Sequence, residues 1–409
     1  MIRSQGRLVE LLALVLVVAL IVFHLDWFLH HSAMVWVFKA LVLFSVIWLS
    51  TWFSRVLGVR VWGLLGVFIV VEAGAWLYAN RLVQGRRYSA PGFAFMRNMA
   101  DDWHRNIFQY DQSLSQYDPE LFYTLRPNLR AGTYKGWEFT TKIDANSAGL
   151  RDDEASLRDP SVVFLGDSFT VGWGVDDTAC FTSQLERLLA CKTLNAGMSS
   201  FGTARETELL KRLDLDSCRL LIVQYCANDD YENKMYQQAN FHLLSSGREV
   251  YDRYVRYNDV TGQYFPFKFL YSALRTVVMP WERAWTARRA AHVAATSAAS
   301  VAAEATPTDI FFQILRHLRR YYRGPVLVTH IEAVGTGPEI IRDFESHLKA
   351  NPMPGVYLAD MSDVLRSADY FAFDNHIIPE GHRKVAQRLN EVIRRHRLLE
   401  KVDVPLPPQ

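Results

Sequence analysis

The stretch Ser161–Val175, "SVVFLGDSFTVGWGV", decides how the chain is interpreted. Its first part is a run of apolar, β-favouring residues that predicts a buried strand, and its glycine-rich continuation predicts a turn into a helix. Such a turn holds the side chain of Ser168 at the carboxyl end of the strand. Parallel α/β sheets place their chemistry at that end. Ser168 is therefore either a nucleophile or only a polar cap.

From Ser161 onward the sequence alternates between strand and helix patterns. Strands are predicted in "VVFLGDS", "KTLNAG", "RLLIVQYCAND", "PVLVTHIEA" and "GVYLADMSDVL". Helices are predicted in "FTSQLERLLA", "TARETELLKRL" and "EGHRKVAQRLNEVIRRHRLLE". This alternation predicts an α/β fold in which helices cover both faces of a parallel sheet.

The polar residues at the predicted strand ends form four ordered blocks. They are Gly166-Asp167-Ser168, "NAGMSSFGTARE", "CANDD" and "DNHIIPEGH". Together they resemble the blocks of the SGNH, or GDSL, hydrolase family. The upstream "NSAGLRDDE" is similar to a stretch that often precedes the catalytic strand in membrane-linked members. The resemblance covers about Asn146 to Val392 and implies the three-layer, flavodoxin-like parallel sheet of the SGNH hydrolase fold.

Cleavage of an ester needs a nucleophile, a base that deprotonates it, and donors aimed at the oxyanion. Ser168 can attack, His376 can accept its proton, and Asp374 can orient the imidazole. The expected oxyanion donors are the backbone N–H groups of Ser168 and Ser200 and the side-chain amide of Asn228. No spacing typical of a metal site or a phosphate loop appears, so neither a metal nor a cofactor is predicted.

The blocks depart from the family pattern at three places. Ser200 occupies the position of the second-block glycine, so a bulkier residue must adopt the backbone angles that glycine allows. Ala227 stands where the third block usually has glycine. Asp374 and His376 are separated by one residue, a spacing that resembles membrane-linked and polysaccharide-modifying members and makes the role of Asp374 less certain than that of His376.

Other polar residues near the blocks have ordinary structural interpretations. Asp167 is expected to be a hydrogen-bonding turn residue, and His382 a packing or capping residue of the last helix. His330 is expected in a loop at the end of a strand, where it could line the pocket. The sequence "GDSFT" lacks the second glycine of the Gly-x-Ser-x-Gly elbow, which argues against the α/β-hydrolase fold.

Three almost continuously apolar runs precede this region, at about Leu8–Phe28, Ala33–Phe53 and Val61–Tyr78. Each approaches the roughly 20 residues that cross a bilayer as a helix, so three transmembrane helices are predicted. A signal peptide is the alternative for the first run. The bulky "FHLDWFLHH" offers no small-residue cleavage site, which favours an uncleaved helix.

The basic residues predict the orientation of these helices. Arg3, Arg7, Arg55 and Arg60 flank the ends expected on the cytoplasmic side, whereas "LDWFLHHSAM" between the first two runs carries no Lys or Arg. The remainder of the chain is then extracytoplasmic. For a bacterial protein, which is an assumption, the localisation is the inner membrane with a periplasmic catalytic domain.

Lys39 and Glu72 are ionisable residues inside the second and third apolar runs. Their similar depth allows an ion pair between the two helices. Snorkelling of Lys39 to the interface beside a neutral Glu72 is the alternative.

The predicted domains are 1–80 as the membrane domain, 81–160 as an extended lead-in, and 161–400 as the hydrolase-like domain with an insertion at 231–308. A short hairpin is expected around Tyr134–Ile143. The insertion segment "FPFKFLYSALRTVVMPWERAW" suits a membrane surface or a cleft cover, although packing against the catalytic core is slightly favoured. The alanine-rich run 288–305 is expected to be an exposed helix or linker.

Four cysteines in an oxidising compartment could form two disulfides. Cys191 and Cys218 both precede predicted strands, so they are the best candidates for one pair. Cys226 is expected to lie near the active-site end of the sheet, where a free buried thiol is ordinary.

The sequence therefore predicts a membrane-anchored serine esterase that hydrolyses acyl esters, acetyl esters included, of an extracytoplasmic glycan or lipid through a Ser-acyl intermediate. One alternative is an O-acyltransferase that modifies a cell-envelope polysaccharide together with a membrane acyltransferase partner. Another is a non-catalytic membrane subunit that binds a glycan. The net charge of +2 gives no reason to expect a nucleic acid partner.

Overall fold

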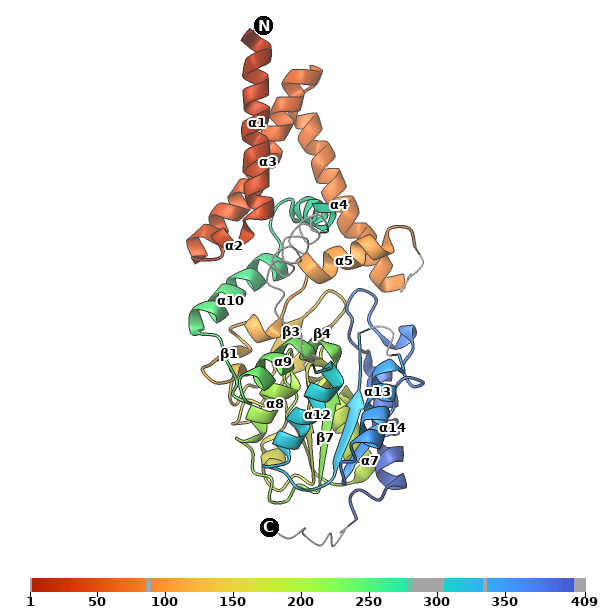
Figure 1. Ribbon diagram of the computed structural model, residues 1–409. Coiled ribbons are helices and arrows are strands. Elements are labelled where there is room, and N and C mark those ends of the chain that lie inside the picture. The colour runs from red at the N-terminus through yellow and green to blue at the C-terminus, as the bar shows by residue number, and fades with distance from the viewer. Residues whose placement is uncertain (1, 86–89, 279, 281–304, 334–336, 401–409) are drawn as a thin grey trace. The chain divides into compact units, whose positions relative to one another are not determined.

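The computed structural model describes residues 2–85, 90–278, 280, 305–333 and 337–400 (Figure 1). The described residues form two compact units. The helical unit comprises those of Met1–Asp111, Glu249–Ala302 and Ala372–Asp374. The sheet unit comprises those of Gln112–Arg248, Ala303–Phe371 and Asn375–Gln409. Each unit is therefore assembled from segments that are distant in the sequence.

A parallel five-stranded sheet is the centre of the sheet unit. Its strands are β5 (Val162–Leu165), β6 (Thr193–Asn195), β7 (Leu220–Tyr225), β8 (Val326–His330) and β9 (Val356–Ala359). Their spatial order is β6-β5-β7-β8-β9, and every neighbouring pair is parallel. This is the flavodoxin-like order, with the switch point between β5 and β7. The α/β fold and the five predicted strands are confirmed.

Helices cover both faces of this sheet. One face carries α7 (Phe181–Leu189) and α14 (Pro379–Arg395), which also contact each other. The other side carries α8 (Thr203–Leu210), α12 (Pro307–Leu318) and α13 (Glu339–Ala350), with α9 (Asp230–Gln238) packed against α8 and α12. The central strands β5, β7 and β8 are buried along their whole length, as expected for a parallel sheet covered on both sides.

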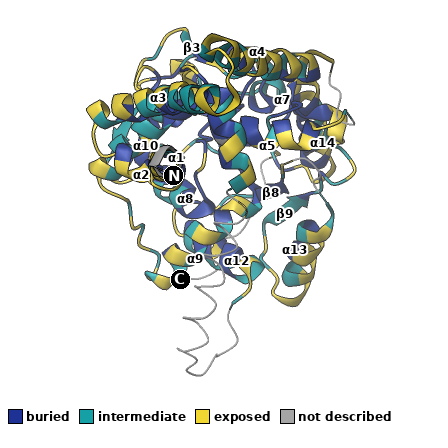
Figure 2. Ribbon diagram, turned by 90° about the horizontal axis from the view of Figure 1, so that it is seen from above, coloured by how far each residue is buried: buried dark blue, intermediate teal, exposed yellow. Residues whose placement is uncertain are grey.

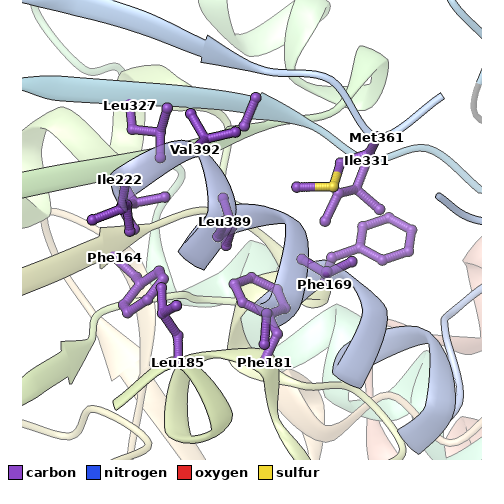
Figure 3. Packing of buried hydrophobic residues seen from close by; sticks show 14 of the residues in the cluster. Phe164, Phe169, Phe181, Leu185, Ile222, Leu327, Ile331, Met361, Leu389 and Val392 are labelled. Carbon is purple, nitrogen blue, oxygen red and sulfur yellow. The ribbon is translucent and has the colours of Figure 1, made fainter. Parts of the chain in front are cut away.

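The core between the sheet and the first helical layer explains why the closing helix forms. Phe164, Ile222 and Leu327 point from three neighbouring strands toward the helices (Figure 3). Leu389 and Val392 of α14 pack into the same cluster, at the spacing of one helix face. Burial of these side chains stabilises the unit by about 1.5–3 kcal/mol for each one fully removed from water.

Two small antiparallel hairpins precede the sheet. The first pairs β1 (Ser115–Asp118) with β2 (Phe122–Leu125), and the second pairs β3 (Gly132–Lys135) with β4 (Thr140–Ile143). The second confirms the predicted hairpin. The first was not predicted, because "SQYD" shows no alternation of apolar and polar residues.

The helical unit contains α1 (Ile2–Phe23), α2 (Leu25–Phe28), α3 (Ser32–Leu57), α4 (Val61–Gly85) and α5 (Phe93–Trp103). Within the described residues, α1, α3 and α4 are long and apolar enough to cross a membrane. Figure 2 shows that much of the surface of α3 and α4 is exposed, and these exposed residues are largely apolar. Length, composition and exposure therefore agree with the three predicted spans.

The insertion packs differently from the favoured expectation. Its helix α10 (Arg248–Gly262) and the helical stretch 268–278 pack against the N-terminal helices. The rings of Phe265 and Tyr271 contact Phe38 of α3 at centroid distances of 5.9 and 5.1 Å. For this segment, the expected packing against the catalytic core is wrong, because its aromatic face joins the apolar cluster of the N-terminal helices. The alanine-rich run lies outside the described residues except for Ala305.

Glu72 and Lys39 do not form the ion pair that their depth allows. The Glu72 carboxylate accepts hydrogen bonds from the backbone N–H groups of Phe269 (2.9 Å) and Leu270 (3.0 Å), at the start of helical stretch 268–278. Lys39 instead contacts the side-chain oxygen of Gln263 at 3.5 Å. The first N–H groups of a helix have no partner within it, so a carboxylate there satisfies donors that would otherwise be stranded in apolar surroundings.

The proposed disulfide is also wrong for this structure. Cys180, Cys191, Cys218 and Cys226 are all free thiols. The Sγ atom of Cys218 contacts the backbone oxygen of Leu220 at 3.4 Å. Cys180 and Cys226 are buried, in keeping with the expectation for Cys226.

We expect Glu72→Ala to lower the free energy of unfolding of the full chain by on the order of 3 kcal/mol, because two N–H donors lose an ionised acceptor. Glu72→Gln keeps one side-chain oxygen as an acceptor, so its free energy of unfolding should fall by less than that of Glu72→Ala. Unfolding of the purified protein in detergent micelles measures both. Lys39→Ala is the matched control, with an expected change of about 0.5 kcal/mol or less. Equal losses in Glu72→Ala and Lys39→Ala would contradict this account.

Candidate active site

Ser168 lies at the carboxyl end of β5, as the sequence predicts. It is the first residue of the short helix α6 (Ser168–Val171), and the Asp167 carboxylate caps this helix by accepting from the Phe169 N–H at 2.9 Å. The turn requires glycine at position 166. A Cβ atom there would lie 2.1 Å from Thr170 Oγ1 and 2.7 Å from Gln224 Oε1. The β5–α6 turn can therefore form only without a side chain at this position.

His376 contacts Ser168 directly. Its Nε2 atom lies 2.6 Å from Ser168 Oγ, and the two residues are only 5% and 6% exposed. A neutral imidazole protonated on Nδ1 accepts the hydroxyl proton at Nε2. The distance is that of a nucleophile and its general base.

The loop that carries His376 is closed by backbone contacts. Tyr370 and Ile377 form a β-bridge, and the Phe371 N–H donates to the His376 carbonyl at 3.0 Å. The imidazole itself lies against two aromatic rings, with the Trp173 ring stacked at 4.9 Å and the Phe169 ring at 5.1 Å. These rings restrict rotation of the imidazole and hold Nε2 toward Ser168.

Asp374 lies in the same loop, two residues before His376. It groups with Ala372 and Phe373 in the helical unit, where the Phe373 ring packs against Phe93 of α5 at 5.7 Å. The orienting role of Asp374 stays a prediction from the sequence.

Asn228 contacts the turn that carries Ser168 through Asp167. It lies in the short 3₁₀ helix Ala227–Asp229 after β7, and its Nδ2 donates to Asp167 Oδ2 at 3.2 Å. A side-chain amide carries two N–H groups, and this bond uses one of them. The neighbouring Ala227 N–H donates to Glu332 Oε1 at 2.6 Å, which holds the 3₁₀ helix in place.

Ser200 lies in the turn after β6, the strand that pairs with β5. Its φ is +60°, so a serine adopts the left-handed conformation that the missing glycine would adopt more easily. The preceding carbonyl, that of Ser199, accepts a 2.6 Å hydrogen bond from the Tyr123 hydroxyl of β2. A hydrogen bond from the β1–β2 hairpin thus holds the turn after β6. Ser168, Ser200 and Asn228 all lie at the carboxyl edge of the sheet.

Arg151 is a buried residue of the site region to which the sequence analysis assigned no role. Its guanidinium donates to the carbonyls of Val171 and Val175 at 3.1 and 2.6 Å, and to that of Gly172. It also pairs with Asp177 at 2.6 Å. The carbonyls belong to the loop after Ser168, so Arg151 fixes the segment that carries Trp173. The sequence signal that could have identified Arg151 was its position in the stretch "NSAGLRDDE", which resembles a family segment.

Buried carboxyl groups lie behind the site. Burial raises the pKa values of Asp167, Glu206 and Asp229, and nearby negative charges act in the same direction on the last two. The Asp229 carboxylate accepts from the Thr203 hydroxyl at 2.9 Å. Carboxyl groups with raised pKa values keep their protons to higher pH.

The two other histidines have structural roles. His382 Nδ1 accepts from the Phe181 N–H at 3.2 Å and so caps α7, and burial lowers the pKa of His382 to about 3. His382 is thus a packing or capping residue as expected, although the helix that it caps is α7 and not its own helix α14. His330, at the end of β8, contacts Glu332 Oε1 at 3.1 Å. Among the described residues, no group of three or more His, Cys, Asp or Glu side chains could hold a metal ion.

No protein-family model and no curated protein sequence matches the chain. Among similar solved structures is a member of the lipolytic protein G-D-S-L family from Veillonella parvula DSM 2008. It is 13% identical with a TM-score of 0.33, covering 57% of this chain and 98% of that one. A carbohydrate acetylesterase family member from Sinorhizobium meliloti is 12% identical with a TM-score of 0.31, covering 58% and 99%.

An acetyl xylan esterase from the rumen bacterium Butyrivibrio proteoclasticus is 11% identical, with a TM-score of 0.33, and the match covers 59% of this chain and 65% of that one. Similarity at this level carries no argument about activity. The chemistry must be inferred from the sheet order and the side chains at its carboxyl edge.

We expect Ser200→Val to lower the free energy of unfolding by about 1–2 kcal/mol, because a β-branched residue is disfavoured at positive φ. Ser200→Gly should cause no such loss, because glycine has no Cβ to clash. Thermal unfolding of the full chain measures both variants. Ser246→Val is the matched control, at an exposed serine outside the set of positive-φ residues. Similar stabilities of Ser200→Val and Ser200→Gly would show that position 200 is unstrained.

Proposed function

We propose that the chain is a membrane-anchored serine esterase of the SGNH type, which cleaves acyl esters, acetyl esters included, of an extracytoplasmic glycan or lipid. The observation that carries this proposal is the 2.6 Å contact between Ser168 Oγ and His376 Nε2 at the carboxyl edge of a flavodoxin-like sheet. The apolar helices α1, α3 and α4 support a membrane anchor.

Acylation begins when Ser168 Oγ attacks the ester carbonyl carbon and its proton passes to His376 Nε2. The carbonyl oxygen becomes an oxyanion, for which the N–H groups of Ser168 and Ser200 and the amide of Asn228 are the proposed donors. Loss of one such donor typically costs about 100- to 1,000-fold in rate. The C–O bond to the alcohol then breaks, and His376 returns the proton to the leaving oxygen.

The second half-reaction removes the acyl group from Ser168. In hydrolysis, a water molecule attacks the acyl carbon while His376 takes its proton, and the carboxylic acid leaves as Ser168 is reprotonated. The imidazolium that forms in each half-reaction lies against the ring of Trp173. A cation over an indole face is stabilised by about 0.5–2 kcal/mol.

A fluorophosphonate probe should label the wild-type chain and fail to label Ser168→Ala, because the probe reacts with an activated serine. His376→Ala should slow both labelling and ester cleavage by about 100- to 10,000-fold, the usual contribution of a general base. Asp374→Asn should retain more activity than His376→Ala if its carboxylate only orients the imidazole. In-gel fluorescence and hydrolysis of a chromogenic acetyl ester measure these effects.

His396→Ala is the matched control, since this histidine is exposed on the surface. Unchanged ester cleavage in His376→Ala would show that another residue is the general base. An unlabelled wild type that still binds a glycan would replace the enzyme with a non-catalytic binding subunit, the alternative that Ser200 and Ala227 favour.

Acyl transfer to a sugar hydroxyl is the second candidate function. The same nucleophile, base and oxyanion donors serve both reactions, since only the acceptor of the acyl group differs. Burial of Ser168 and His376 favours this candidate, because a site with little access to solvent limits competition from water. The membrane helices would then bring the site to a membrane acyltransferase partner that supplies the acyl group.

The two reactions are separated by product analysis. The full chain is supplied with a chromogenic acetyl ester, with and without oligosaccharides of cell-envelope polysaccharides, and both acetate and acetylated sugar are quantified. For an esterase, acetate should equal the released chromophore whether or not sugar is present. Acetylated sugar formed at the expense of acetate, and absent in Ser168→Ala, would establish transfer instead.

A further inference from the structure

A cavity lies in the helical unit, between α4 and the insertion. It has a volume of about 640 Å³, within the range of small-molecule sites. One wall is a single face of α4, formed by Ile69, Glu72, Ala73 and Trp76 at helical spacing. The opposite wall is segment 264–269 of the insertion, with Tyr264, Pro266, Phe267 and Phe269. Glu72 is the only charged residue of this lining.

Hydrogen bonds to Glu72 fix the two walls to each other. Glu72 Oε1 accepts from the Phe269 N–H at 2.9 Å and from the Tyr264 hydroxyl at 3.4 Å, and Oε2 accepts from the Leu270 N–H at 3.0 Å. Both carboxylate oxygens are thereby used within the protein. An apolar ligand in the cavity would therefore not leave the Glu72 carboxylate without hydrogen-bond donors. The remaining lining offers mainly hydrocarbon and aromatic surface.

The position of the cavity on α4 determines which molecules can reach it. Ile69 and Trp76 are 57% and 51% exposed, on a helix apolar and long enough to span a bilayer. Exposed apolar residues within a membrane span face lipid. A cavity that opens beside them is in contact with hydrocarbon chains, the most concentrated apolar ligand in that environment.

We propose that this cavity binds one acyl chain of a bilayer lipid. The chain lies between Trp76 of α4 and the aromatic residues Phe267 and Phe269, and the Glu72 contacts keep the cavity open in the absence of a ligand. Preformed apolar sites bind with less loss of protein entropy than sites that must be ordered by the ligand. The inference depends on membrane insertion of α4 and not on the chemistry of Ser168.

The test uses photocrosslinking of the full chain in phospholipid vesicles that contain phosphatidylcholine with a diazirine in the middle of one acyl chain. Mass spectrometry then maps the crosslinked residues. Crosslinks to Trp76, Phe267 and Phe269 should exceed those to Val70 and Leu77 several-fold. Val70 and Leu77 are also exposed on α4 but do not line the cavity.

A filling variant separates a binding site from ordinary contact with lipid. Ala73→Phe places a ring inside the cavity and should lower crosslinking of Trp76, Phe267 and Phe269 several-fold, while Val70→Phe adds the same ring outside it and should not. Ile69→Phe is a second filling variant if Ala73→Phe fails to fold, and the thermal unfolding of each variant in detergent micelles reports whether it folds.

Uniform crosslinking along the exposed face of α4 in the wild type would overturn the proposal without any variant. Full crosslinking of the cavity residues in a folded Ala73→Phe would do so as well. If a second polypeptide prevented crosslinking of the cavity residues to lipid, the occupant of the cavity would be a protein instead. Crosslinking needs no catalytic turnover. If the crosslinks map to the cavity but the protein cleaves no ester, only the proposed enzyme function is refuted.

Discussion

The candidate site depends on the parallel alignment of five strands, because this alignment brings their carboxyl ends to one edge of the sheet. The turns after β5, β6 and β7 carry Ser168, Ser200 and Asn228 to that edge. A one-residue slip would move every side chain of a strand to the opposite face of the sheet and disrupt the packing on both faces. The geometry of the serine and its neighbours is thus set by apolar packing far below them, and the polar contacts of Arg151 refine it.

Much of this arrangement was predictable from the sequence. The apolar runs of β5, β7 and β8 are short, rich in β-favouring residues and followed by polar blocks, so both the strands and the edge residues could be located. The contact between Ser168 and His376 follows from the same reasoning, although 208 residues separate them. The long apolar helices α1, α3 and α4 were equally visible, because length and composition alone predict them.

The interactions that secure the site were not predictable in the same way. Arg151 bonds mainly to backbone carbonyls, which every residue possesses, so the sequence does not mark its partners. The stacking of Trp173 on His376 depends on a turn whose path is known only in three dimensions. In the helical unit, depth suggested that Glu72 and Lys39 were partners, but the first N–H groups of a helix from the insertion bind the carboxylate instead.

The partners of Glu72 also have a consequence for biosynthesis. Phe269 and Leu270 follow it by 197 and 198 residues, and most strands of the sheet unit are made in between. At about 5–20 residues per second, this interval corresponds to roughly 10 to 40 s of translation. During that time α4 is synthesised but the Glu72 carboxylate lacks these two donors. Completion of the helical unit therefore has to wait for a segment that emerges from the ribosome after much of the sheet.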